Sequence, residues 1–278
     1  MSKETEKSSG RLVSKKVAAF VIIMLVAPVS VAYCLHNFGQ ASVKANETAN
    51  YYYQLNIPQA GQKVVCIVFD DGWQSQYTTA VPIMNKYGFK ASFAIITGYV
   101  DDQNSNYMSW PEIVNLAKQG EDIESHTYSH LNLNIQSLST IAFQLSQSQK
   151  DLMNHGINAR LFIYPDGGGA GNATVENLVS SYYFVGRSIN PGALNMSQPF
   201  DRYDLPAYPM ENTTTLSMFE QIVNQAGNSS VVIVYFHKID DENIDTATTP
   251  QTFAAEMQYL YDNNFTVETM KQLFMATS

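Results

Sequence analysis

Cysteine is almost absent from this chain of 278 residues. Its two cysteines, Cys34 and Cys66, lie in separate apolar runs, so we expect no disulfide framework. Basic residues are also scarce, and five of the 16 lie in the first 16 positions. Residues 17–278 therefore hold 11 basic and 23 acidic residues, a net charge of −12 for that part of the chain. Because phosphate binding needs a basic surface, nucleic acid is not an expected partner. The length of 278 residues, 45% of them hydrophobic, is enough for one large domain or two small ones, and the sequence has no internal repeat.

One long uncharged run, residues 17–35, follows the basic tail at residues 1–16. Its length fits a membrane-spanning helix, and the basic tail before it predicts a cytoplasmic N-terminus. A cleaved signal peptide is the alternative, because small residues at 43–45 form a possible cleavage tail. We therefore expect a single-pass cell-membrane protein with an extracytoplasmic domain, or a secreted one if the segment is cleaved. Residues 36–62 are predicted to form a polar stalk and residues 63–278 the folded domain.

After the stalk, short apolar runs typical of strands alternate with segments typical of helices. The strand-like runs are 64–69, 91–96, 122–126, 159–165, 182–188 and 231–237. The helix-like segments are 76–88, 110–120, 137–155, 174–181, 217–227, 249–264 and 267–274. Such alternation indicates βαβ units and a parallel sheet. The number of units predicts an α/β fold, a distorted (β/α) barrel of about seven parallel strands.

Polar residues that can do chemistry follow several of these predicted strands. Asp70 and Asp71 end the first strand, and His126 and His237 end two others. Parallel α/β folds place their functional sites at the carboxyl ends of strands. Two adjacent carboxylates repel each other and resist burial, so they should either face water or be neutralised.

A pair of histidines offers a partner for those carboxylates. His126 and His130 are four residues apart, and on a helical turn this spacing puts both imidazoles on one face. A carboxylate and two imidazoles form a common three-ligand set for a catalytic metal ion. Each feature taken alone has an ordinary structural explanation, but their shared position at one sheet edge favours a metal site.

These motifs resemble the polysaccharide deacetylases of the NodB-homology type, which are metal-dependent carbohydrate esterases. The F-D-D-G motif of that family matches residues 68–73, and its H-[ST]-x-x-H motif matches residues 126–130. Its apolar strand that ends in histidine matches residues 233–237. The resemblance extends over residues 63–274.

The resemblance implies a role for each matched residue. Asp71, His126 and His130 would bind one divalent metal ion, expected to be zinc, although cobalt, nickel and iron also suit this ligand set. Asp70 would take a proton from the attacking water, and His237 would give one to the departing amine. The implied substrate is a glycan that contains N-acetylglucosamine, and the implied product is acetate. The sequence does not predict the oligomeric state.

The chain departs from the family pattern at one position. Many members have an arginine two residues before the proline of a third motif, where it holds the base aspartate, but this chain has Ile163. The segment 162–168 is more similar to the F-x-Y-P-x-G subgroup, associated with poly-N-acetylglucosamine-type polymers. Arg160 and Arg187 are both candidates for the missing cation, and Asp204 is a candidate support near His237.

The same resemblance suggests substrate contacts near the third motif, at Tyr164, Pro165 and Asp166. Trp73, next to the aspartates, is a further candidate for contact with a sugar. Two alternatives are open at this stage. The metal site could hydrolyse another C–N amide bond, or the chain could be a non-catalytic glycan-binding envelope protein.

Overall fold

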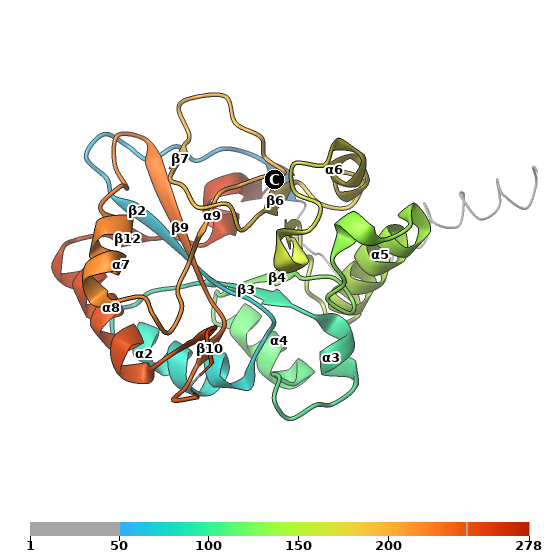
Figure 1. Ribbon diagram of the computed structural model, residues 1–278, viewed down its shortest axis with the longest axis horizontal. Coiled ribbons are helices and arrows are strands. Elements are labelled where there is room, and N and C mark those ends of the chain that lie inside the picture. The colour runs from blue at the N-terminus through green and yellow to red at the C-terminus, as the bar shows by residue number, and fades with distance from the viewer. Residues whose placement is uncertain (1–50, 243, 278) are drawn as a thin grey trace, which may run out of the picture. The chain divides into compact units, whose positions relative to one another are not determined.

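The computed structural model describes residues 51–242 and 244–277 (Figure 1). The predicted tail and membrane segment at residues 1–35 lie outside the described residues. Among the helices that are described, none is long and apolar enough to span a bilayer. Strand β1 (Tyr51–Tyr53) pairs antiparallel with β13 (Met275–Thr277). Residues 51–53 therefore belong to the folded unit, although we predicted them as part of the stalk.

The described residues form a curled, mostly parallel sheet. Its longer strands are β2 (Val64–Phe69), β3 (Ser92–Ile95), β4 (Asp122–Ser125), β5 (Leu161–Ile163), β6 (Val185–Arg187) and β9 (Ser230–Phe236). Their order is β6-β5-β4-β3-β2-β9, and all of these neighbours run parallel. Its short strands are β7 (Leu194–Asn195), β8 (Tyr208–Pro209) and β12 (Thr266–Val267), whereas β10 (Lys238–Ile239) and β11 (Ala247–Thr248) form a separate two-stranded sheet. The prediction of an α/β fold with a curled parallel sheet is confirmed.

The space between β6 and β9 is spanned by residues 205–210 instead of a seventh long strand. The Leu205 amide donates to the Gly186 carbonyl at 3.0 Å, and the Met210 amide donates to the Tyr235 carbonyl at 2.9 Å. Pro206 and Pro209 explain the irregularity, because proline has no amide hydrogen to donate to a strand ladder. The sheet is consequently a half-barrel with an irregular closing segment, not a regular barrel.

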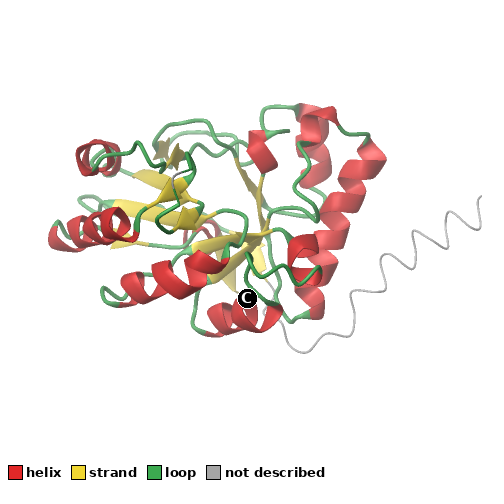
Figure 2. Cartoon of the chain, turned by 60° about the horizontal axis from the view of Figure 1, so that its bottom comes forward, coloured by secondary structure: helices red, strands yellow, loops and turns green. Residues whose placement is uncertain are grey.

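Helices surround the outer face of this sheet (Figures 1 and 2). They are α2 (Val81–Asn85), α3 (Thr97–Asp101), α4 (Trp110–Lys118), α5 (Leu138–Asn154), α6 (Ala173–Val179), α7 (Leu216–Val223) and α8 (Pro250–Asp262). The helix α9 (Met270–Phe274) instead packs with Val64 and Cys66 of β2, which point to the opposite face of the sheet. Shorter helical turns are η1 (Gln76–Ala80), η2 (Leu133–Ile135) and η3 (Pro165–Gly167). The predicted helices at 110–120, 137–155 and 249–264 begin where Ser109, Ser137 and Thr249 cap the first turn.

Alternation along the strands divides the core into two sides. In β2, Ile67 and Phe69 pack outward with the helices, whereas Cys66 and Val68 pack with strand residues of β5, β6 and β9. The strands β5 and β6 are not neighbours of β2 in the sheet. Their side chains can touch those of β2 only on the concave side, where the curled sheet brings distant strands together. Successive side chains of a strand point to opposite faces, so Asp70 continues the concave row.

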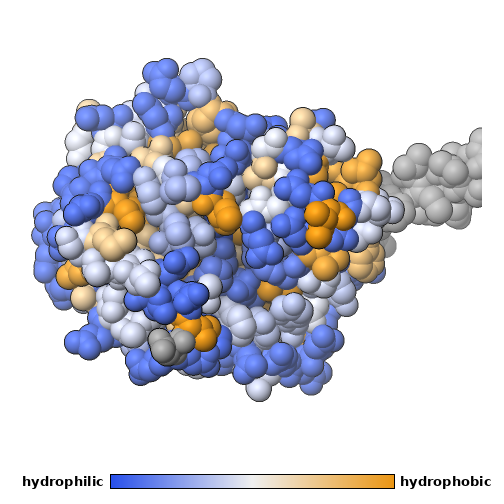
Figure 3. All heavy atoms as spheres, viewed as in Figure 1, coloured by the Kyte–Doolittle hydropathy of each residue, from blue (hydrophilic) through white to orange (hydrophobic). Residues whose placement is uncertain are grey.

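The face of the molecule shown in Figure 3 is mostly covered by hydrophilic side chains. Hydrophobic side chains appear there as small, separate areas. Scattered apolar side chains of this kind are ordinary on a surface that faces water.

A buried carboxyl on α8 should make the stability of this fold depend on pH. Glu256 is 0% exposed, neither of its carboxyl oxygens has a hydrogen-bond partner among the described residues, and burial raises its pKa to about 8. Between pH 4.5 and about 8, the Glu256 carboxyl is therefore protonated in the folded chain but ionised in the unfolded chain. The free energy of unfolding should consequently fall between these two pH values, by up to ~1.4 kcal/mol per pH unit.

Glu256→Gln should remove this dependence and stabilise the protein by about 3 kcal/mol at pH 7. Denaturant unfolding at a series of pH values measures both effects. Glu220→Gln, on the partly exposed side of α7, is the matched control and should keep the wild-type slope. Equal slopes for Glu256→Gln and the wild type would show that Glu256 is already ionised in the folded chain.

Candidate metal centre and active site

Strand alternation brings four of the predicted site residues to the concave side of the sheet. Asp70 follows β2, His126 follows β4 and His237 follows β9, and Arg187 is the last residue of β6. Each continues an inward row, such as Val64, Cys66 and Val68 in β2. The ladder also continues past the strand ends, because the amides of Asp70 and His126 donate to the carbonyls of Phe236 and Ile95 at 2.8 and 3.0 Å.

Asp71, His126 and His130 converge on one point. The Asp71 Oδ1 atom lies 3.4 Å from Nε2 of His126 and 3.4 Å from Nε2 of His130. The three candidate ligand atoms lie within 4.8 Å of one another. The predicted ligand set is therefore assembled in the structure.

Local backbone conformation and hydrogen bonds aim these three side chains. Asp71 and His130 both have positive φ angles, 75° and 56°, which turn them out of the regular strand and helix directions. The His126 Nδ1–H donates to the Ile163 carbonyl at 2.8 Å. This bond leaves Nε2 of His126 as the nitrogen that faces Asp71, and such second bonds commonly orient histidines that bind metals.

The electrostatics of the cluster depend on burial and on mutual charge. Burial alone would raise the pKa of the Asp71 carboxyl, but His126, His237 and His130 together hold that pKa well below its usual value. Burial opposes a raised pKa of His126, yet the adjacent Asp71 and Asp70 carboxylates still raise it. Burial and repulsion from His126 lower the pKa of His130. The Asp71 carboxylate therefore stabilises a positive charge at this point. Without a metal that charge is a proton on His126, and a metal cation can take its place.

The cluster fits a divalent metal ion. The Asp71 Oδ1 atom is buried and has no hydrogen-bond partner among the described residues, so it is available as a ligand. Separations of 3.4 Å are close to the edge of a tetrahedron whose centre lies about 2.1 Å from each ligand atom. Two imidazoles and one carboxylate are also a suitable donor set for zinc and similar ions.

Arg187 is the cation that pairs with Asp70. Its Nη2 donates to both carboxylate oxygens of Asp70, and its side chain is 0% exposed. Its Nη1 donates to the Ser188 carbonyl at 3.2 Å, and its guanidinium lies 4.4 Å from the centre of the Tyr235 ring. An arginine from β6 therefore takes the place expected for an arginine near residue 163.

The other two candidate supports lie elsewhere. Arg160 precedes β5, at the opposite end of the strand from the site, and stacks on the Phe184 ring at 5.6 Å. Asp204 accepts a hydrogen bond from Asn190 at 3.1 Å, so its described contact is with the loop after β6. The sequence analysis did not decide whether Arg160 or Arg187 pairs with Asp70. The alternation of side chains in β6 could have favoured Arg187, because Val185 and Arg187 share the concave face.

The predicted substrate contacts differ in exposure. The Tyr164 side chain is 1% exposed and packs against Phe162 and Tyr183, so its ring is part of the core. This corrects its prediction as a substrate contact: it shares the outward face of Phe162, two residues earlier. Pro165 is also buried, whereas Asp166 is exposed and its charge acts on the nearby His130.

Gln76 is a buried residue of the site that the sequence analysis missed. Its side-chain amide donates to the backbone carbonyls of Asp70 and His237, at 2.6 and 2.9 Å. The chain ends of β2 and β9 are thereby linked behind the two proposed catalytic side chains. Gln76 lies within a helix-like segment, and nothing in the sequence pattern distinguishes it from a surface glutamine.

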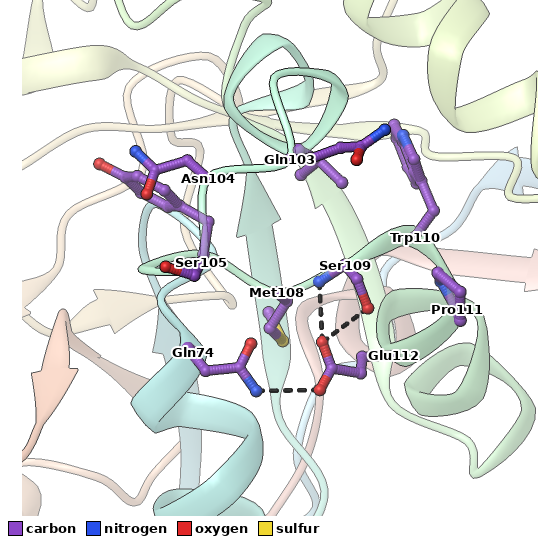
Figure 4. Close-up of a pocket in the computed structure, with 11 residues that line it drawn as sticks. Gln74, Gln103, Asn104, Ser105, Met108, Ser109, Trp110, Pro111 and Glu112 are labelled. Atoms are coloured by element: carbon purple, nitrogen blue, oxygen red, sulfur yellow. Dashed lines mark hydrogen bonds between the residues drawn. The ribbon is translucent and has the colours of Figure 1, made fainter.

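A cavity of about 510 Å³ lies between Gln74 and the segment that leads into α4 (Figure 4). It is lined by residues 103–105 and 107–112 together with Gln74 and Val100. At its base, Gln74 donates to Glu112 at 2.9 Å, and Glu112 also accepts from Ser109 (Figure 4). Tyr107, in the lining of the cavity, stacks on Trp73, and burial and the Asp71 charge raise the pKa of Tyr107 to about 12. The lining is mostly apolar, with a few amide and hydroxyl groups that can bond a hydroxyl-rich ligand.

A curled parallel sheet with a carboxylate and two imidazoles at its strand ends defines an α/β domain with a candidate catalytic metal centre. Residues 58–184 match the family model described as polysaccharide deacetylase. This is the family that the motifs of the sequence resemble, and the match covers residues 58–184 of the 278 residues.

Known relatives share this region or this fold. YxkH of Bacillus subtilis, named as a polysaccharide deacetylase, is 29% identical over 59% of this chain and 57% of its own length. The match thus spans less than two thirds of that relative. The Xyl-CE4 domain of a multidomain xylanase from the hindgut metagenome of Trinervitermes trinervoides has a TM-score of 0.56, 20% identity, and coverage of 77% of this chain and 90% of that one.

The same fold also occurs in BA3943 of Bacillus anthracis, described as a CE4 family pseudoenzyme. It has a TM-score of 0.52, 13% identity, and coverage of 77% of this chain and 66% of that one. The fold alone therefore does not establish activity.

Proposed function

We propose that this protein is a metal-dependent hydrolase that removes N-acetyl groups from a glycan that contains N-acetylglucosamine and releases acetate. The observation that carries the proposal is the convergence of Asp71, His126 and His130 beside the paired Asp70 and Arg187. The match of residues 58–184 to the polysaccharide deacetylase family model supports the reaction class. We further propose that the domain lies outside the cytoplasm, because the segment at 17–35 is typical of a membrane anchor or signal.

A divalent ion bound by the three ligands would lower the pKa of water and polarise the carbonyl of the acetamide. Asp70, held by Arg187, offers a carboxylate that accepts the proton of the attacking water. His237, held through its carbonyl by Gln76, offers an imidazole that donates a proton to the nitrogen of the departing amine. The water's hydroxyl is thereby added to the acetyl carbon, and the C–N bond breaks.

The cavity beside Tyr107 offers space for part of the glycan next to the reacting sugar. Its amide and hydroxyl side chains, at Gln74, Gln103, Asn104 and Ser105, can bond sugar hydroxyls. The proposal therefore favours a polymer or oligomer over an isolated small amide. The zinc ion is the expected cofactor, with cobalt, nickel and iron as the other candidates.

The test uses the full chain, stripped of metal and supplied with zinc, cobalt, nickel or iron one at a time. Acetate release from chitooligosaccharides and from poly-N-acetylglucosamine is measured. We expect release that depends on added metal and is lost in His126→Ala, because this variant removes a metal ligand. His155→Ala, at the end of α5, is the control and should keep its metal binding.

Three outcomes separate the candidate functions. Metal-dependent acetate release that is lost in His126→Ala supports the proposal. Stoichiometric metal binding without acetate from any glycan would favour hydrolysis of another amide or the non-catalytic role that the pseudoenzyme of this fold represents. A chain that binds no metal would contradict the proposed mechanism.

A further inference from the structure

We propose that Trp73 is a positioning residue that fixes the carboxylate of Asp71 for the metal ion, and that its ring is not a surface for sugar stacking. This inference rests on the proposed metal centre. It assigns to Trp73 a role opposite to the sugar contact expected from the sequence.

The edge of the indole holds one oxygen of Asp71. The Trp73 Nε1–H donates to Asp71 Oδ2 at 2.8 Å, while Oδ1 lies 3.4 Å from each imidazole. A carboxylate held at one oxygen cannot rotate freely about its Cβ–Cγ bond. The hydrogen bond therefore selects Oδ1 as the atom that faces His126 and His130, and outer partners of this kind tune metal affinity.

Two other side chains already pack over the indole ring. The Tyr107 ring stacks on Trp73 with centres 4.4 Å apart and planes inclined by 22°. The Lys238 ammonium lies over the same indole, 4.5 Å from its centre, and pairs with Glu242 at 2.6 Å. The indole therefore already has an aromatic ring and an ammonium group packed against it. A sugar ring that stacks on Trp73 would compete with these contacts.

The backbone around Trp73 is held as well. The Met108 amide donates to the Gly72 carbonyl at 2.9 Å, and the Gln74 amide donates to the Asn106 carbonyl at 2.8 Å. Trp73 thus joins three segments: the aspartate pair, the loop before α4, and Lys238, which directly follows His237. A side chain fixed at its edge, its ring and its backbone is well suited to hold a metal ligand in place.

The experiment compares the two tryptophans of the chain. Trp110 is a matched control, because its Nε1–H also donates to an aspartate, Asp101, at 2.8 Å, and its ring also stacks, on His155 at 3.8 Å. Metal-free wild type, Trp73→Phe and Trp110→Phe are titrated with Co²⁺ and followed by visible absorption. Thermal unfolding of the metal-free proteins accompanies each titration.

We expect Trp73→Phe to bind Co²⁺ about 10–100-fold more weakly, because phenylalanine keeps an aromatic ring but lacks the N–H group. Trp110→Phe should bind Co²⁺ with wild-type affinity. Trp73→Tyr, which also lacks the indole N–H, should weaken binding like Trp73→Phe and provides a second variant if the first does not fold.

Unchanged Co²⁺ affinity in a folded Trp73→Phe or Trp73→Tyr would overturn the inference and leave the metal centre intact. Equal losses in the Trp73 and Trp110 variants would also overturn it, because the effect would then be one of general stability. A wild-type chain that binds no Co²⁺ would instead contradict the proposed function itself.

Discussion

Replacing Arg187 with methionine is expected to lower the free energy of unfolding by about 3–5 kcal/mol. The methionine side chain is long and unbranched, so it fills much of the same space but carries no charge. Arg187 is 0% exposed and Asp70 is 3% exposed, so the variant leaves a carboxylate buried without its partner. Chemical denaturation at neutral pH measures the loss.

The cost should come from the unpaired charge and not from lost packing. Taking two charges out of water is costly, and breaking a buried pair leaves one charge without compensation. Asp70→Asn alone should also destabilise the chain, since Arg187 then loses its carboxylate. The double variant Arg187→Met with Asp70→Asn should recover part of the loss, because neither member then carries a buried charge.

Arg202→Met is the matched control for this pair. Arg202 stacks on the Tyr53 and Tyr203 rings at 4.9 and 5.0 Å and is partly exposed. Its replacement should cost less than about 1 kcal/mol. If Arg187→Met were no more harmful than Arg202→Met, the Asp70 carboxylate would not depend on Arg187 in the folded chain.

Asp70→Asn is expected to reduce the rate of acetate release about 10²–10⁴-fold while the chain still binds its metal ion. The amide of asparagine cannot accept a proton from water, so the variant removes the proposed base. The three ligand side chains are left unchanged, because Asp70 does not belong to the Asp71, His126 and His130 cluster. Turnover and Co²⁺ titration on the same preparation separate the two effects.

Asp262→Asn is the control for that experiment. Asp262 lies at the exposed end of α8 and accepts a hydrogen bond from Gln258 at 2.7 Å. Its replacement should change neither turnover nor metal affinity. A rate for Asp70→Asn close to that of Asp262→Asn would assign the base to another group, and loss of metal would place Asp70 among the ligands.

Much of the fold could be predicted from local patterns. The strands β2 and β9 are short runs of apolar residues, and the helices α4 and α8 begin at hydroxyl caps followed by proline. Such signals depend on neighbours along the chain, so the sequence displays them. The closing segment at 205–210 has no such signal, because its bonds run to two strands that are distant in the sequence.

The candidate ligands Asp71, His126 and His130 could also be predicted from the sequence alone, since Asp71 and His126 lie at the ends of predicted strands and His130 belongs to the same motif as His126. Only the tertiary structure decided which arginine pairs with Asp70, that Tyr164 faces the core, and that Trp73 binds Asp71 by its edge. Those facts depend on which residues from distant strands share the concave face. Moving a residue by one position along a strand turns its side chain to the other face of the sheet, although the composition and the motif spacing hardly change.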